Sequence, residues 1–136
     1  MITFNYETDF ILDNQNSTVL WIQQILVKHT RTEGEINFIF CNDEYLHQLN
    51  MQFLQHDTYT DVISFDNSLG NLISGDIFIS IDRVQDNAKR FTTTFYEELH
   101  RVMIHGVLHF IGFKDKNEDD ILIMRQQEDA ALSLLS

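Results

Sequence analysis

The sequence predicts a single α+β domain in which about five helices pack on a small mixed β-sheet of about four strands. Its 136 residues, 43% of them hydrophobic, suffice for one core but not for two. Short β-branched and aromatic runs alternate with longer amphipathic segments in the order β α β α β β α α α. Proline is absent, and no repeat, linker or low-complexity tract divides residues 1–136.

The chain is expected to open with a strand, a helix and a second strand. Residues 2–7 (ITFNYE) and 35–41 (EINFIFC) are rich in β-branched and aromatic side chains, which is typical of strands. Between them, Ser17 is expected to cap an amphipathic helix that ends near Thr30.

A second helix and a pair of strands are expected in the middle of the chain. Asn42 and Asp43 offer a cap to a helix over residues 43–54, which stops before the polar loop 55–60. Two apolar runs, 61–65 (DVISF) and 75–81 (GDIFISI), read as strands. The turn residues between them favour antiparallel pairing.

Three helices are expected in the remainder of the chain. Asp82 can cap a helix over residues 82–91, and residues 94–97 (TFYE) have the spacing of a capping box for the next helix. Gly112 is expected to end that helix with a left-handed residue. The last helix, within residues 117–135, starts with acidic side chains, which the helix dipole favours at an N-terminus.

The composition excludes several classes of protein. A net charge of −12 argues against a surface that binds nucleic acid nonspecifically, so any such contact requires a local positive site or a partner protein. Cys41 is the only cysteine, which excludes an intrachain disulfide and a thiolate zinc site. The N-terminus lacks a signal-peptide pattern and no apolar run approaches about 20 residues, so a cytoplasmic protein without membrane contact is expected.

Two histidines one helical turn apart predict a metal site at the end of a central helix. His105 and His109 share a helix face, so both imidazoles can reach one ion at about 2.0–2.1 Å. Gly112 allows the chain to reverse, which brings Asp115 back over that face. Two histidines and one aspartate leave a fourth position open for water, as in catalytic zinc sites, and predict one Zn²⁺ per chain. The alternative is a pair of partly buried structural histidines.

Gly106, between the two histidines, indicates both how the helix packs and which enzyme class is excluded. Glycine in a helix costs about 1 kcal/mol relative to alanine, which indicates a close backbone contact at this turn. In zincin metalloproteases the residue after the first histidine is a glutamate that acts as the base. Glycine at that position argues against an ordinary metalloprotease.

Three blocks of sequence between residues 49 and 116 carry a family resemblance. HGVLHFIGFKD resembles the metal signature HGxLHxxGYDH of the YbeY family, bacterial metal-dependent endoribonucleases, and GDIFIS resembles its GDIVIS strand. LNMQFLQHDTYTDVISF resembles its LNxxYRGKDxPTDVLSFP segment, with eight identities at Leu49, Asn50, Asp57, Thr60, Asp61, Val62, Ser64 and Phe65.

The resemblance implies a zinc-dependent endoribonuclease that hydrolyses RNA phosphodiesters. Its expected roles are maturation of the 3′ end of small-subunit ribosomal RNA and ribosome quality control. The expected partners are ribosomal RNA and the small ribosomal subunit or its proteins. The family's α+β fold agrees with the predicted order of strands and helices.

Two departures from the family pattern concern the site. Asp115, after Lys114, stands where the family motif has a third metal-binding histidine, and Leu54 replaces an arginine expected to hold RNA phosphate. Arg101, one turn before His105, can compensate and is expected to act in catalysis by stabilising the charge of the transition state. Phosphate contacts are expected from Arg101, Lys114 and Lys116. The alternative is that these three are ordinary solvated charges.

The proton-transfer residue is left open by the sequence. Glu98 and Asp61 are the candidates. The alternative for Glu98 is an exposed position in the first helical turn, and the alternative for Asp61 is a loop-capping role. Three further histidines are expected to have surface or capping roles, namely His47, His56 and His100.

Two other functions fit the same ligands. Two histidines and a carboxylate also form the facial triad of non-haem iron(II) oxygenases. Alternatively, the metal is structural and the protein is a noncatalytic ribosome assembly factor whose acidic surface binds a basic ribosomal protein. The missing arginine at Leu54 supports the latter.

Overall fold

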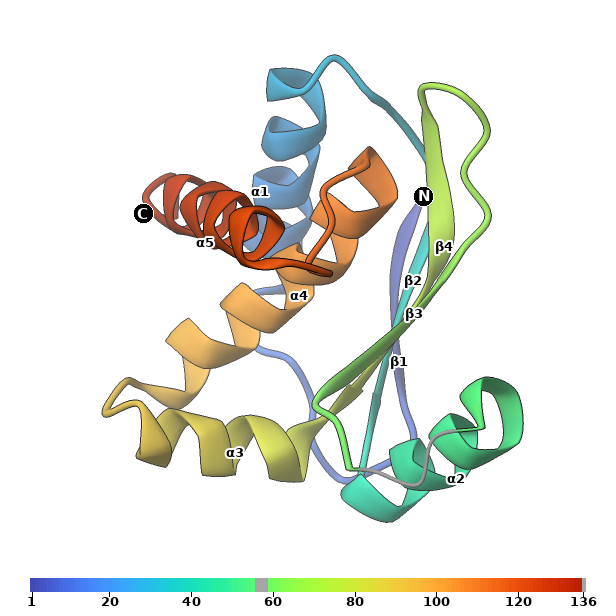
Figure 1. The fold of residues 1–136 in the computed structure, drawn as a ribbon, viewed down its shortest axis with the longest axis vertical. Coiled ribbons are helices and arrows are strands. Elements are labelled where there is room, and N and C mark those ends of the chain that lie inside the picture. Colours follow the sequence, from blue (N-terminus) through green and yellow to red (C-terminus); the bar gives the residue numbers. More distant parts are fainter. Residues whose placement is uncertain (56–58, 136) are drawn as a thin grey trace.

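The computed structural model describes residues 1–55 and 59–135, and its elements follow the predicted order (Figure 1). Its strands are β1 (Ile2–Tyr6), β2 (Thr32–Cys41), β3 (Val62–Asp66) and β4 (Leu72–Ser80). Its helices are α1 (Gln15–Lys28), α2 (Asp43–Leu54), α3 (Ile81–Arg90), α4 (Phe95–Ile111) and α5 (Glu118–Leu132). The predicted α+β class is confirmed, with four strands and five helices in the described part of the chain.

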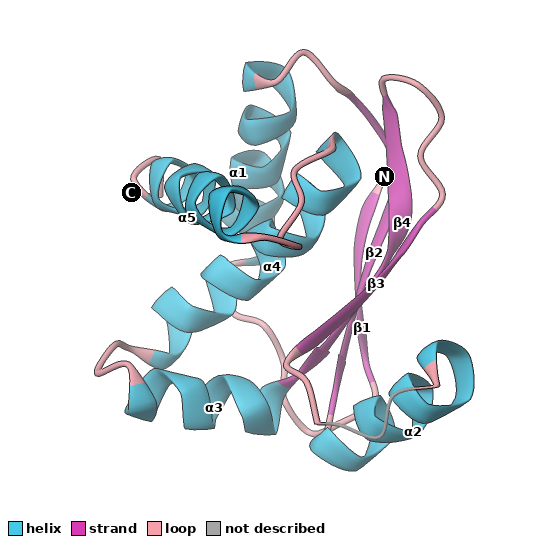
Figure 2. Cartoon of the chain, viewed as in Figure 1, coloured by secondary structure: helices cyan, strands magenta, loops and turns pink. Residues whose placement is uncertain are grey.

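The four strands form one mixed sheet in the order β1-β2-β4-β3. Strands β1, β2 and β4 are parallel, and β3 pairs antiparallel with β4, as the turn between them predicts. Figure 2 shows α1, α4 and α5 on one side of the sheet and α2 on the other. Successive side chains of β4 point to opposite faces of the sheet. Ile77 and Ile79 join the main core on one face, whereas Phe78 packs near Leu46 of α2 on the other.

Helix α4 is the central helix, and it lies unusually close to β4. A Cβ built on Gly106 of α4 would lie only 2.9 Å from Ile77 Cδ1 of β4. A Cβ built on Gly75 of β4 would lie 2.5 Å from Phe110 Cζ of α4. The close contact predicted at Gly106 is therefore present, and the group that fills it is a core side chain.

Two of the predicted helix caps are wrong. Helix α1 begins after Asn14, which has φ 58°, and the Ser17 hydroxyl donates to the Asn14 carbonyl at 2.9 Å instead of accepting an N–H. Helix α3 is capped by Ser80, whose hydroxyl accepts an N–H of the first turn at 3.2 Å. The Asp82 carboxylate accepts the first N–H of α2 instead, at 2.9 Å. In each case a tertiary or backbone partner outweighs the local capping preference.

Strands β2 and β4 both begin earlier than the sequence predicts, at Thr32 and Leu72, and these extensions pair with each other. The residues TEGE at 32–35 have little strand preference, so the pairing itself holds them extended. Gly34 is required there, because a Cβ would collide with Ser74 Oγ. Helix α1 ends at Lys28 rather than near Thr30, which has φ 55°.

Two exclusions made from the sequence can be compared with the structure. Among the described helices, none combines the length and the apolar character needed to cross a membrane. Cys41 is fully buried, and burial together with nearby carboxylates raises the pKa of its thiol to about 12. A thiol in this state is a small core side chain and not a metal ligand.

Replacing Gly75 with alanine should destabilise the protein by about 1–3 kcal/mol, because the new methyl group overlaps the Phe110 ring and the β3 backbone. Urea unfolding followed by circular dichroism measures this change. Gly70→Asn is the control, since Gly70 has φ 58° in open space and asparagine tolerates that conformation. Equal stability of the two variants would contradict the close α4–β4 contact.

Candidate metal centre

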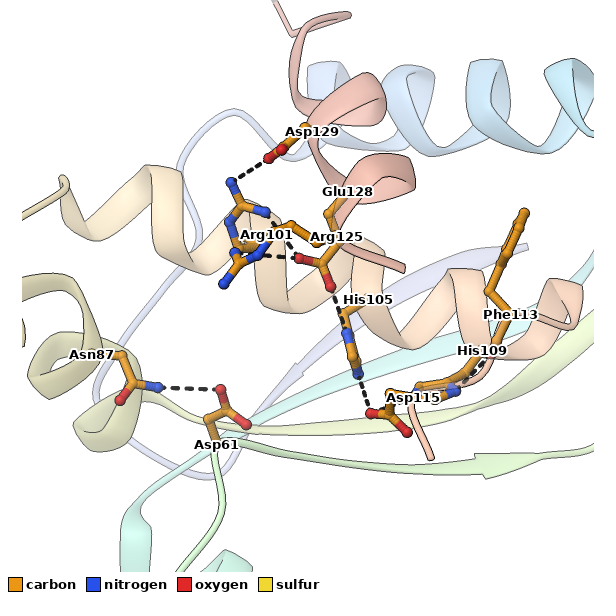
Figure 3. Close-up of polar contacts among 10 residues, drawn as sticks. All are labelled: Asp61, Asn87, Arg101, His105, His109, Phe113, Asp115, Arg125, Glu128 and Asp129. Atoms are coloured by element: carbon orange, nitrogen blue, oxygen red, sulfur yellow. Dashed lines mark hydrogen bonds and ion pairs between the residues drawn. The ribbon is translucent and has the colours of Figure 1, made fainter. Parts of the chain in front are cut away.

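Three potential metal ligands come together at the C-terminal end of α4, as predicted. His105 and His109 lie one turn apart on α4, and their ring centroids are 4.5 Å from each other. Asp115 Oδ2 lies 3.4 Å from the Nε2 atom of each histidine (Figure 3). Within the described ranges these three residues form the single group whose donor atoms are close enough to share an ion.

The chain reverses at Gly112 to bring Asp115 over the helix. Gly112 has φ 125°, a conformation that favours glycine, and its N–H is shared between the Leu108 and His109 carbonyls, at 3.1 Å each. The Phe113 N–H then donates to the Leu108 carbonyl at 3.0 Å. These bonds close the end of α4. They fix the direction in which the next segment, residues 113–117 with Asp115 (the ligand loop), leaves the helix.

Each histidine ring is oriented by a hydrogen-bond acceptor beside its Nδ1 atom. His109 Nδ1 lies 3.0 Å from the Phe113 carbonyl, which can only accept, so this nitrogen carries the hydrogen. His105 Nδ1 lies 2.7 Å from Glu128 Oε2 of α5. With Nδ1 held as the donor in each ring, Nε2 is the atom that can offer a lone pair to an ion bound between the two histidines and Asp115. Metal-bound histidines in proteins have this arrangement.

Two of the three separations between the donor atoms suit a tetrahedral ion such as zinc. Ligands at about 2.0–2.1 Å from a tetrahedral centre stand roughly 3.3–3.4 Å from one another. The two His–Asp separations of 3.4 Å match that spacing. The side chains of His105, His109 and Asp115 are 22%, 28% and 44% exposed, so an ion between them would be reachable from solvent. Two neutral imidazoles and a carboxylate also suit the ion chemically.

Glu128 links the metal centre to Arg101. Its other oxygen, Oε1, accepts from the Arg101 guanidinium at 2.9 Å, and the same guanidinium bonds Asp129 at 2.8 Å. Burial opposes the charged forms of His105 and Glu128. Their mutual hydrogen bond and charges nevertheless raise the pKa of His105 and lower the pKa of Glu128. The predicted phosphate contact Arg101 therefore lies in the site, with its guanidinium already in two ion pairs.

A cleft of about 350 Å³ opens beside the metal centre, between α3, α4, α5 and the start of β3. It is lined by two of the proposed ligands and by all three residues predicted to take part in catalysis. These residues are His105, Asp115, Asp61, Glu98 and Arg101. The structure thus brings together side chains that lie up to 54 positions apart in the sequence, as the numbering 61 and 115 shows.

The two candidate proton carriers both line this cleft. Glu98 is only 6% exposed, so the alternative that placed it on an exposed turn is wrong. Burial and the nearby Asp61 charge raise the pKa of Glu98. Asp61 is half-buried and accepts from Asn87 Nδ2 at 3.2 Å. Burial raises the pKa of Asp61 too, although His105 works in the opposite direction.

The remaining predicted residues lie outside this cleft's lining. Lys114 and Lys116 are exposed on either side of Asp115. Leu54 ends α2, on the other side of the sheet from the metal centre, and is 43% exposed. His47 stacks on Tyr59 with ring centroids 4.1 Å apart.

His100 and His56 complete the set of unassigned histidines. His100 is partly exposed and packs edge-on against Trp21 of α1, with ring centroids 5.4 Å apart. His56 lies outside the described residues, as does Asp57 of the family resemblance.

The sequence interpretation missed Glu128, although a signal was present. Met124, Glu128 and Ala131 follow one another at spacings of four and three and are the buried residues of α5. A carboxylate on the core-facing stripe of a helix needs a buried partner. The sequence does not show which partner, because His105 is 23 positions away on another helix.

Comparisons with known proteins give a consistent result. The family model described as Endoribonuclease YbeY matches residues 3–136. The endoribonuclease YbeY of Flavobacterium johnsoniae is 54% identical over 134 residues, and that of Flavobacterium psychrophilum is 55% identical over 134 residues. Both alignments cover 98% of this chain and 96% of the relative. A Thermotoga maritima protein of known solution structure is 27% identical, with a TM-score of 0.70 over 98% of this chain and 87% of that one.

Replacing Glu128 with alanine should weaken zinc binding about 10- to 100-fold, because His105 loses the partner that orients its ring. Competition with a chelating fluorophore measures the affinity. Asp129→Ala is the matched control, since it removes the other carboxylate bound to Arg101 and leaves the His105 contact intact. Equal affinities in the two variants would remove Glu128 from the metal centre.

Proposed function

Because the chain belongs to the Endoribonuclease YbeY family, we propose that it hydrolyses phosphodiester bonds within RNA at one Zn²⁺ ion held by His105, His109 and Asp115. The observation that carries this proposal is the convergence of two Nε2 atoms and one carboxylate oxygen beside a cleft, each Nδ1 atom having an acceptor behind it. In the motif, Asp115 stands at the position of the family's third histidine, and its Oδ2 lies 3.4 Å from both Nε2 atoms.

When bound, a zinc ion would supply an activated water and polarise a phosphoryl oxygen. The chain's own residues would do the rest. Glu98 and Asp61 line the same cleft and are the proposed carriers of the proton. Arg101 contributes positive charge at the cleft wall, where Glu128 and Asp129 hold its guanidinium in place. The exposed Lys114 and Lys116 are proposed to contact flanking phosphates.

The proposed substrate is ribosomal RNA in the cytoplasm, at the 3′ end of the small-subunit RNA, and the proposed cellular roles are its maturation and ribosome quality control. The family resemblance supports this assignment. The net charge of −12 supports a partner as well, because RNA contact is then confined to the cleft region and the small subunit or its proteins would help to present the substrate.

Two alternatives make different predictions. A noncatalytic assembly factor would use the metal to hold its fold together. An iron(II) oxygenase would take iron and consume oxygen with an oxidisable cosubstrate. The family match favours the nuclease over the oxygenase.

Replacing Asp115 with alanine should reduce bound zinc from about one ion per chain to near zero and abolish RNA cleavage. Metal analysis of the purified protein measures the occupancy. Asp119→Ala is the control, since Asp119 is an exposed carboxylate of the first turn of α5. Full occupancy in Asp115→Ala would exclude this ligand and direct attention to His56 or another carboxylate.

Replacing His109 with alanine should leave the protein folded but lower cleavage by more than about 100-fold, the upper range for loss of an outer-sphere partner. His109 is partly exposed, and its ring contacts the ligand loop rather than the core. Thermal melting and an RNA cleavage assay are measured together, with His47→Ala on α2 as the control. Loss of cooperative melting in His109→Ala, or in wild type after zinc chelation, would support the assembly factor instead.

A further inference from the structure

Two large apolar side chains are exposed within the otherwise charged cleft beside the metal centre. Phe91, directly after α3, is 58% exposed, and Ile121, in the first turn of α5, is 54% exposed. Both line the cavity of about 350 Å³ that also contains His105 and Asp115. This volume is within the range of pockets that bind small molecules. This apolar surface is therefore accessible to a substrate bound at the proposed metal site.

Phe91 also borders a second hollow, and its backbone is fixed. A neighbouring cavity of about 220 Å³ is lined by Phe91 together with Arg101 and Arg125. The Phe91 N–H donates to the Asn87 carbonyl at 2.9 Å, and the Thr93 N–H donates to the Ala88 carbonyl at 3.0 Å. The Phe91 ring is therefore exposed, while hydrogen bonds at the C-terminal end of α3 hold its backbone in place.

Most of the basic residues of this acidic chain lie in or beside the cleft. Arg101 and Arg125 line the cleft, Lys114 and Lys116 flank Asp115, and Lys89 and Arg90 immediately precede Phe91. These six are two thirds of the nine basic residues in a chain of net charge −12. The cleft lining also holds four carboxylates, those of Asp61, Glu98, Asp115 and Glu128, so a polyanion is favoured at the basic residues that flank the cleft and once a divalent ion offsets these charges.

Hydrogen-bonding groups face the same space. Asp61 and Asn87 line the cavity and lie across it from His105 and Asp115, as Figure 3 shows. An amide and a carboxylate suit the polar edge of a nucleobase, and a phenyl ring suits its face. A base in a duplex has both faces covered by its neighbours, so only an unpaired base can occupy this position.

We propose that Phe91 is a stacking platform for one unpaired base of the RNA substrate, next to the phosphodiester held at His105, His109 and Asp115. The inference rests on the proposed endoribonuclease function and adds a substrate-positioning residue to it. The aromatic face of Phe91 receives the base and so positions the neighbouring phosphodiester.

The test uses the zinc-loaded full chain and a short single-stranded RNA, alone and annealed to its complement. Removal of one base–aromatic stack corresponds to roughly a 5- to 150-fold loss. Phe91→Ala should lower kcat/KM by that factor on the single strand. Phe91→Leu, which keeps apolar bulk without a π face, should lose nearly as much, and Phe91→Tyr should restore most of the activity. Wild type should cleave the duplex far more slowly than the single strand.

Phe53→Ala is the matched control, because Phe53 on α2 is 57% exposed and lies on the other side of the sheet. Abasic substitutions scanned along the RNA supply a second readout. One position should lower wild-type cleavage strongly yet have little further effect in Phe91→Ala, since both changes remove the same stack. Melting temperatures of the Phe91 variants should equal that of wild type.

The outcomes separate this inference from the function on which it rests. Wild-type activity retained by Phe91→Ala, additive effects of the variant and every abasic site, or equal cleavage of duplex and single strand would each overturn the stacking platform while leaving the nuclease intact. Absence of RNA cleavage by zinc-loaded wild type would overturn the proposed function and this inference with it.

Discussion

The close approach of α4 to β4 is the constraint on which the site depends. Gly106 and Phe110 lie four residues apart and face the sheet, where Ile77 and Gly75 receive them. Each site histidine directly precedes one of these residues, and a helix turns by about 100° per residue, so the core contact also sets the direction of both imidazoles. A helix held further from the sheet would shift the metal ligands relative to Asp61, which precedes β3.

The electrostatics of the cleft agree with a bound cation. Among its lining residues, Asp61, Glu98, Asp115 and Glu128 carry four formal negative charges, against two positive charges on Arg101 and Arg125. A divalent ion would bring this formal sum to zero. RNA phosphate would otherwise approach a negative cleft in a strongly acidic protein, so the proposed ion would also make the approach favourable.

The features that sequence reasoning recovered are local. Spacing of the histidines, the chain reversal at Gly112 and the strand and helix order all follow from patterns within a few residues. Those that it missed depend on contacts between distant segments. Ser80 rather than Asp82 caps α3 because the Asp82 carboxylate bonds the start of α2. Glu128 approaches His105 through helix packing, and no spacing rule connects two residues on separate helices.

If the proposed site binds its ion, the position of Glu128 on α5 would link occupancy of the site to the docking of that helix in one equilibrium. A carboxylate that orients His105 increases affinity for the ion, and thermodynamic reciprocity requires the bound ion to stabilise the docked helix by the same free energy. Local opening of α5, the kind that amide hydrogen exchange detects, would therefore release the ion more readily. Metal supply would in turn govern how often the C-terminal helix detaches.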